Sequence, residues 1–408
     1  MSQIDIVLAL AAGIVMLLGL WSKPIKKSVL QEPVIALAIG VGVGPYGLGW
    51  LDLATWGDGA AILREAARLT MAVGLVAVAL SIDTRTVARL WRPLTLLLTL
   101  GMVGMWLVAS GLAMGFLALP LWSALLLGAI VAPTDPIVAA SIVSGPVADR
   151  HLPRRLRDTI SFESGANDGL AYAIVMLPIL MIAQPAGTAW TEWLVDSLLV
   201  GTLGAAAIGG AVGFGAARLL AHAKRRKLIE RHSFLSYTIA LSLLTLGIST
   251  LVGAEALISV FLAGLVFNAC TDSDQAHEEE NVQEAIANLL TLPMFALFGL
   301  AAPVEDWIAL GWPLAGLVAA IILLRRVPVV LAMARGFAPL TLADTTYAAW
   351  FGPIGFAAIY YALIAAEAVG DPNLWTLASA IIFGSIVVHG MTATPFTRLY
   401  GRVTRRAD

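Results

Sequence analysis

The sequence contains little charge and almost no cysteine. Only 13% of its 408 residues are Asp, Glu, Lys or Arg, against about 25% in an ordinary soluble domain, whereas 59% are hydrophobic. This composition excludes a mostly soluble protein and predicts an all-α, polytopic membrane protein. The single cysteine, Cys270, excludes an internal disulfide and a cysteine-based metal cage. The net charge of −2 gives no indication of nucleic-acid binding.

Long apolar runs dominate the chain instead. A transmembrane helix needs about 17–25 apolar residues, and such runs occur at about thirteen places. They are 4–21, 30–50, 60–82, 94–117, 120–146, 156–183, 194–220, 233–251, 254–269, 284–302, 307–331, 344–367 and 374–394. The first run has no basic segment before it and no evident cleavage site, so we expect a retained helix rather than a signal peptide.

Basic residues follow alternate spans. Clusters of Lys or Arg occur after spans 1, 3, 5 and 7, with a single Arg after span 11 and a further cluster after span 13. Because basic loops stay in the cytoplasm, we expect the N-terminus outside and the C-terminus inside. The expected location is a bacterial inner membrane, with residues 399–408 as a short cytoplasmic tail.

Weak self-similarity relates the two ends of the chain at an offset of about 220 residues. The segment 32–40 resembles 255–263, and 64–69 resembles 283–289. Seven spans separate the partners, so the two copies run in opposite directions across the membrane. We therefore predict two inverted six-helix repeats, spans 1–6 within residues 1–185 and spans 8–13 within 233–398, with 186–232 as linker span and basic loop.

The same offset relates prolines in spans 5 and 12. Proline and glycine in mid-span interrupt a helix, and breaks at corresponding positions of two inverted halves indicate the binding site of a transporter. Ordinary proline kinks are the alternative. The predicted broken-helix residues are Pro133, Pro136, Gly352, Pro353 and Gly355.

The break in span 5 also carries a carboxylate. Thr134 or Asp135 suits the N-cap of a new half-helix that starts at Pro136. Asp135 would offset the positive end of the helix dipole, and this capping role is compatible with ion binding. The unwound carbonyls around Pro133 and Thr134 would be free to coordinate a cation.

Span 6 contains a second cluster of oxygens. Glu163 and Asn167, like Ser164 and Asp168, are four residues apart and share one broad helix face. Asp168 lies about 16 Å into the span at about 1.5 Å per residue, close to the middle of a roughly 30 Å hydrocarbon layer. A charge at that depth costs roughly 2.5–3.5 kcal/mol and so indicates a function.

Oxygen-rich clusters suit hard cations such as Na⁺ or Li⁺. Burial favours the protonated carboxyl, so a cation and a proton can compete for Asp168; a hydrogen-bonded structural carboxylate is the alternative. The predicted ion- and proton-binding residues are Asp168, Asn167, Ser164, Thr134 and Asp135.

Span 11 contains positive charges that can compensate the carboxylates of spans 5 and 6. Arg325 and Arg326 are the only arginines in this span. We expect one of them either to pair with Glu163 or to extend to the cytoplasmic interface, the usual course for arginine near a helix end. Glu255 lies at a predicted helix start, where acidic residues are favoured, and is assigned no further role.

At these residues the chain resembles the monovalent cation/proton antiporters, the family that includes bacterial NhaP-type Na⁺/H⁺ antiporters and animal sodium/proton exchangers. The segment 133–136 is similar to the broken-helix motif of this family, and 163–168 to its Glu-Ser-x-x-Asn-Asp signature. Arg326 resembles its membrane arginine and 389–392 its last-span motif.

The resemblance implies that Asp168 carries the exchanged ion or proton, that Ser164 and the Thr134 backbone are further Na⁺ ligands, and that Glu163 pairs with Arg326. It also implies a homodimer, with spans 4–6 and 11–13 as a moving core and spans 1–3 and 8–10 as an interface domain. No cofactor is expected.

One position departs from the family pattern. Span 12 of similar proteins commonly has arginine where Ile354 stands here, so a positive charge that would balance a half-helix end is missing. Arg325 is a candidate substitute.

The predicted function is exchange of Na⁺ or Li⁺ for H⁺ by alternating access, and the chain is not expected to be an enzyme. A K⁺/H⁺ antiporter is an alternative, as is a Na⁺-coupled organic-anion symporter, which would need a larger basic pocket. An intramembrane aspartyl protease is disfavoured because its sequence patterns do not occur around Asp135 or Asp168. The sequence does not indicate cation order or stoichiometry.

Overall fold

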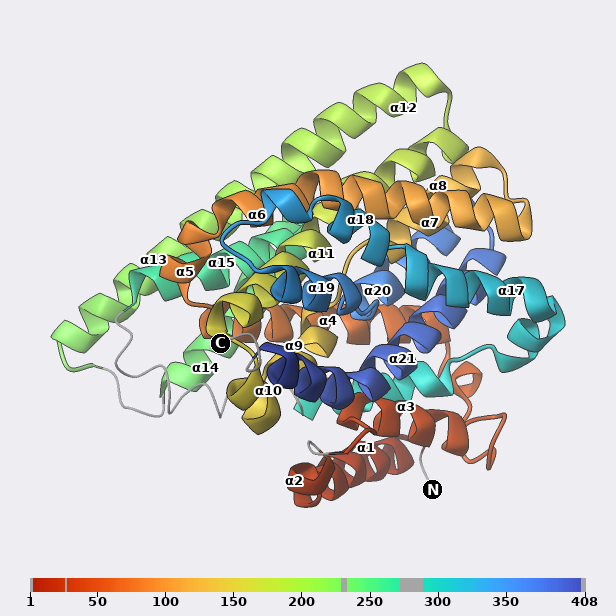
Figure 1. Ribbon diagram of the computed structural model, residues 1–408, viewed down its shortest axis with the longest axis horizontal. Helices are drawn as coiled ribbons and strands as arrows, with labels where there is room; N and C mark the ends of the chain where they lie inside the picture. Colours follow the sequence, from red (N-terminus) through yellow and green to blue (C-terminus); the bar gives the residue numbers. More distant parts are fainter. Residues whose placement is uncertain (1–2, 26–27, 229–232, 272–288, 405–408) are drawn as a thin grey trace.

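A computed structural model describes residues 3–25, 28–228, 233–271 and 289–404. Every regular element among these residues is a helix, so the predicted all-α class is confirmed for the described part of the chain. Figure 1 shows the helices in several directions around a central group that includes α11 (Arg154–Ala183), α4 (Gly59–Ser81) and α20 (Phe356–Val369).

The first predicted repeat contains, besides α4 and α11, eleven elements. They are α1 (Gln3–Leu20), α2 (Ser22–Ile25), α3 (Glu32–Val43), η1 (Leu53–Trp56), α5 (Thr84–Arg89), α6 (Trp91–Leu96), η2 (Leu97–Gly101), α7 (Met102–Leu117), α8 (Leu121–Val131), α9 (Pro136–Val143) and α10 (Gly145–His151). The predicted linker span is one continuous helical stretch, with α12 (Ala186–Glu192), η3 (Trp193–Gly204) and α13 (Ala205–Arg225) in succession.

The second predicted repeat has a corresponding series, completed by α20. Its other elements are α14 (Ser233–Leu251), α15 (Ala256–Cys270), the helix Leu289–Leu300, α17 (Val304–Leu324), α18 (Val327–Ala332), η5 (Ala334–Gly336), α19 (Leu342–Trp350) and α21 (Asn373–Thr404).

Helices occupy each range that the sequence predicted as a span; residues 284–288 of the tenth range lie outside the described residues. Among the described helices, six stretches are long and apolar enough to cross a membrane, and two of them (121–140 and 304–332) contain an interruption. The six stretches are 91–117, 121–140, 154–183, 186–225, 304–332 and 373–404. The other apolar helices are shorter, so the membrane part of the fold combines long helices with short and interrupted ones.

The two predicted helix breaks are confirmed. In span 5, α8 ends at Val131 and α9 begins at Pro136; in span 12, α19 ends at Trp350 and α20 begins at Phe356. The breaks touch each other, because the backbone N–H of Asp135 donates to the carbonyl of Pro353 at 2.8 Å. Two interrupted helices therefore cross inside the protein.

Glycines bring α11 close to α15. A side chain at Gly165 would meet the ring of Phe261 at 2.3 Å, and one at Gly169 would meet the Cα of Ile258 at 2.7 Å. Small residues at such positions let membrane helices approach closely. The contact places Asp168, next to Gly169, near the beginning of α15.

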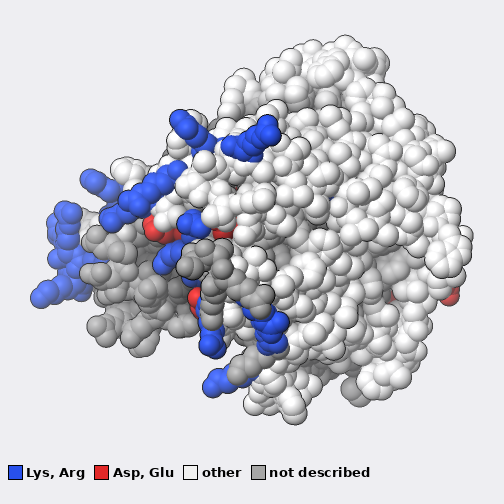
Figure 2. All heavy atoms as spheres, in the orientation of Figure 1, with Lys and Arg blue, Asp and Glu red and all other residues white. Residues whose placement is uncertain are grey.

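Basic side chains collect at one side of the molecule. Figure 2 shows Lys and Arg at the side where α13 ends and the C-terminus lies, while most of the remaining visible face carries no charge. A wide uncharged surface with exposed Leu, Val and Trp side chains is what a lipid-facing protein requires.

Candidate ion-binding site

Asn167 joins span 6 to the break in span 5. Its side-chain oxygen accepts from the backbone N–H of Thr134 at 3.0 Å, and its amide nitrogen donates to Thr134 Oγ1 and to Glu163 Oε1, each at 2.9 Å. The hydroxyls of Thr134 and Ser164 lie 3.0 Å apart. All four side chains are buried, so the structure brings these predicted site residues together in one network.

Asp168 lies in the same helix but takes no part in that network. Only 1% of the residue is exposed, and both carboxylate oxygens are buried without a hydrogen-bond partner in the described part of the protein. Its backbone carbonyl accepts from the hydroxyl of Tyr361 at 2.9 Å. An uncompensated buried carboxylate is costly, so this group requires a proton or a cation.

Arg326 and Glu163 form a two-pronged ion pair. The guanidinium donates through Nη1 to Oε1 at 2.8 Å and through Nη2 to Oε2 at 2.9 Å. Its Nε also donates to the carbonyl of Ala348 at 3.0 Å. Only 2% of Arg326 and 1% of Glu163 is exposed, so the ion pair is buried. The negative charge of Glu163 is therefore compensated by Arg326.

Arg325 is buried as well, with 2% exposed, so the expectation that an arginine extends to the interface is wrong for both residues. Its Nη1 donates to the carbonyls of Val131, Ala132 and Pro133, and its Nη2 to that of Gly352. One positive charge thus contacts the negative C-terminal end of α8 and the second break. The Pro133 carbonyl, expected to be free for a cation, is occupied by this guanidinium at 3.1 Å.

Asp135 caps both half-helices. Its Oδ1 accepts from the backbone N–H groups of Ile137 and Val138, each at 2.8 Å, and its Oδ2 accepts from that of Phe356 at the start of α20. One carboxylate thus satisfies amides at two positive helix ends. The capping role is present in the structure, and direct ion ligation by Asp135 stays a prediction.

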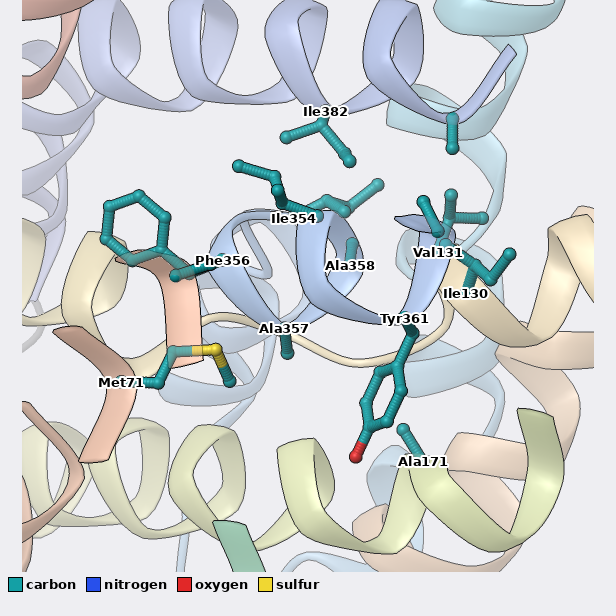
Figure 3. Close-up of a cluster of buried hydrophobic side chains, with 14 of the residues drawn as sticks. Met71, Ile130, Val131, Ala171, Ile354, Phe356, Ala357, Ala358, Tyr361 and Ile382 are labelled. Carbon is teal, nitrogen blue, oxygen red and sulfur yellow. The ribbon is translucent and has the colours of Figure 1, made fainter. Parts of the chain in front are cut away.

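Ile354 lies in an apolar environment. Figure 3 shows its side chain next to Ile382, and only 1% of the residue is exposed. Its backbone N–H donates to Ser385 Oγ at 2.8 Å. The crossing therefore has no charge at this position, and Arg325 supplies positive charge from another helix.

Sequence reasoning missed three contributors. Ser385 had no evident signal within the apolar span 13, and Tyr361 lies in an equally apolar stretch of span 12. Glu255 was recognised only as a residue at a helix start. The sequence did carry a signal for Glu255. It is an acidic residue directly before a long apolar run, and it occupies the position in the second repeat that corresponds to Glu32 in the first.

Two interrupted helices that cross at a buried carboxylate, with their ends balanced by further buried charges, are an arrangement typical of membrane carriers with broken helices. Sequence comparison places this chain more narrowly. The family described as "Sodium/hydrogen exchanger, transmembrane" matches residues 9–399, and the chain belongs to that family.

Similar proteins come from fungi, bacteria and archaea. A probable Na⁺/H⁺ antiporter of Schizosaccharomyces pombe is 30% identical over 95% of this chain, and a K⁺/H⁺ antiporter, NhaP, of Alkalimonas amylolytica is 28% identical over 90%. The chain spans 55% of the first relative and 62% of the second. The sodium proton antiporter MjNhaP1 from Methanocaldococcus jannaschii matches in structure with a TM-score of 0.77 at 17% identity, covering 97% of this chain and 98% of that one.

Proposed function

We propose that this protein is a secondary active transporter that exchanges Na⁺ or Li⁺ for H⁺ without a cofactor. The observation that supports it best is Asp168, a buried carboxylate whose two oxygens have no partner among the described residues. Two other buried acids of the site have compensation, Glu163 from Arg326 and Asp135 from backbone amides. Asp168 is therefore the group that needs a mobile positive charge.

The proposed cycle follows from this single charge. Asp168 releases a proton on one side of the membrane and binds a dehydrated cation there. The loaded core then moves, and the cation is replaced by a proton on the other side. Because Asp168 carries a single negative charge, the cation and the proton cannot bind to it together. The neutral, loaded forms of the site cross the membrane at lower cost than an empty carboxylate, so the core moves only with a cation or a proton bound. These two conditions enforce exchange.

The neighbours of Asp168 have separate proposed roles. Ser164 and Thr134 offer hydroxyl oxygens and the Thr134 carbonyl as cation ligands, which suits a hard cation. The hydrogen bonds of Asn167 to Thr134 and Glu163 support a positioning role for its amide, in addition to the ligand role predicted from the sequence.

Two alternative cargoes differ in their support. K⁺/H⁺ exchange is favoured by relatives named for it, such as the protein of Alkalimonas amylolytica, and by the same oxygen ligands. An organic anion carried with Na⁺ needs an available positive charge. Arg325 and Arg326 are already bonded to backbone carbonyls and to Glu163, which argues against that cargo.

The assembly proposed here keeps the predicted organisation. Spans 4–6 and 11–13 form the moving core, spans 1–3 and 8–10 the interface domain, and two copies form a homodimer. The proposed orientation has the N-terminus outside and the C-terminus in the cytoplasm of a bacterial inner membrane. The collection of basic side chains on one side (Figure 2) supports that orientation.

Proton flux tests the proposal. Proteoliposomes or everted vesicles with an internal acid gradient should show cation-dependent alkalinisation when Na⁺ or Li⁺ is added to the wild-type protein. Asp168→Asn should abolish the signal. Asp371→Asn is the matched control, because Asp371 is exposed and its contact with the backbone N–H of Asn373 can also be made by asparagine.

Absence of cation-driven proton flux in the wild-type protein would overturn the proposed function. Full exchange by Asp168→Asn would overturn the role of that carboxylate while leaving the function in place. A response to K⁺ with none to Na⁺ or Li⁺ would select the alternative cargo.

A further inference from the structure

Most buried carboxylates of the described residues have an evident partner. Glu163, Asp158 and Asp344 each lie within ion-pair distance of an arginine, and Asp135 accepts three backbone N–H groups. Such compensation is what makes a buried charge tolerable. Buried carboxylates that lack it therefore point to missing cations.

Besides Asp168, Glu255 is poorly compensated. The residue is 5% exposed, and no Lys or Arg in the described ranges forms an ion pair with it. Its Oε2 caps α15 by accepting from the backbone N–H of Ile258 at 2.7 Å. Its Oε1 lies 3.5 Å from the hydroxyl of Tyr361, at the outer limit of a hydrogen bond.

Tyr361 connects the two undercompensated acids. Figure 3 shows its ring extending from α20 toward α11 near Ala171, and its hydroxyl donates to the backbone carbonyl of Asp168 at 2.9 Å. Glu255 Oε1, Tyr361 Oη and the Asp168 carbonyl thus form a small group of oxygens, the ligand type that alkali cations prefer.

The proposed orientation places this group toward the outer side of the membrane. In the proposed orientation α15 begins on the outer side, as does the stretch of η3 whose Gly201 carbonyl accepts from the Glu255 backbone N–H at 3.0 Å. Arg68, in the outer part of α4, donates through Nη1 to Thr250 Oγ1 at 3.2 Å, five residues before Glu255 in the chain. In that orientation Glu255, the N-cap of α15, lies at the outer end of its span.

We propose that Glu255 and Tyr361 form a second cation-binding site, an outer station that holds the alkali cation before it reaches Asp168. The inference rests on the proposed exchange function and adds a specific residue to it. A purely structural role for Glu255 would be its cap on α15, and the two roles can be separated by substitution.

Glu255→Gln separates them, because glutamine Oε1 can still accept from the Ile258 N–H while the charge is lost. In right-side-out vesicles this variant should raise the external Na⁺ concentration for half-maximal exchange about tenfold, the lower end of the effect of losing one supporting group of a metal site. In everted vesicles, which expose the cytoplasmic face, the Na⁺ concentration for half-maximal exchange should change less than twofold. Glu305→Gln, an exposed Glu→Gln change on the outer side, should behave as wild type on both faces.

A binding measurement removes the dependence on transport. Purified Asp168→Asn should keep a Na⁺-dependent rise in thermal unfolding temperature, weaker than that of wild type, and Asp168→Asn/Glu255→Gln should lose it. Equal responses of the single and double variants would overturn the second site, as would an unchanged external Na⁺ requirement in Glu255→Gln.

Tyr361→Phe provides a second variant should Glu255→Gln not fold. It keeps the ring and removes one proposed ligand, so it should raise the external Na⁺ requirement in the same direction; wild-type behaviour in this variant would count against the site. Failure of the proposed function is recognised separately, because the wild-type protein would then show no exchange from either face.

Discussion

Removing Arg326 should destabilise the protein more than removing Glu163. Arg326→Met retains most of the side-chain volume but leaves Glu163 buried without its guanidinium partner, with the amide of Asn167 at 2.9 Å as its remaining hydrogen-bond donor in the described structure. Loss of one partner of a buried pair costs about 3–5 kcal/mol. Glu163→Gln should cost less, because Arg326 keeps its bond to the Ala348 carbonyl and can donate to the new amide oxygen.

The combined substitution Glu163→Gln/Arg326→Met removes both charges and should be more stable than Arg326→Met alone by about 2 kcal/mol, within the usual coupling range for residues in contact. The exchanged pair Glu163→Arg/Arg326→Glu should also recover part of the loss. Reversible unfolding in lipid–detergent micelles titrated with SDS measures these free energies. A double variant whose loss equals the sum of the two single losses would refute the ion pair as a source of stability.

Three further predictions concern single positions. Asn167→Asp should lower both stability and exchange rate, because the new carboxylate cannot donate to Glu163 as the amide does at 2.9 Å; unfolding and proton flux check this, and an unaltered variant would contradict it. Gly352→Ala should prevent stable folding, because the new Cβ would lie 2.1 Å from Cδ of Arg326. A variant that elutes from size exclusion as a monodisperse, wild-type-like protein would disprove this. Asp83→Ala removes the N-cap of α5 and should cost about 0.5–2 kcal/mol. The side-chain hydrogen bond from Thr86 lowers the pKa of Asp83, so this stabilisation is present above the unfolded pKa and is lost as pH falls through the lower folded value; a cost for the variant that stays constant down to pH 2 would contradict it.

Features with a local cause could be predicted from the sequence. Proline and glycine act on their own backbone, so the interruptions around Pro133 and Pro353 were evident without tertiary information. Counting along one apolar helix indicated that Asp168 is buried, which the structure shows, and the four-residue spacing of Glu163 and Asn167 anticipated their contact.

Features created by packing could not be predicted. Arg325 and Arg326 are neighbours, and their span is interrupted between Leu324 and Val327. Arg326 reaches the Glu163 carboxylate, as the family resemblance implied, but the contacts of Arg325 with backbone carbonyls had no signal in the sequence. No sequence pattern indicates that both would be buried. Tyr361 of α20 meets Glu255, the N-cap of α15, across 106 residues of the chain.

The contacts of Arg325 join two segments that are far apart in the chain. Its guanidinium holds carbonyls on both sides of the crossing, while Asp135 from the first half caps the helix that starts at Phe356 in the second. Neither half can complete its own interrupted helix. If the halves were produced as two polypeptides, each would expose unpaired carbonyls or amides in the membrane, so we expect them to be degraded when made singly and to accumulate only when made together.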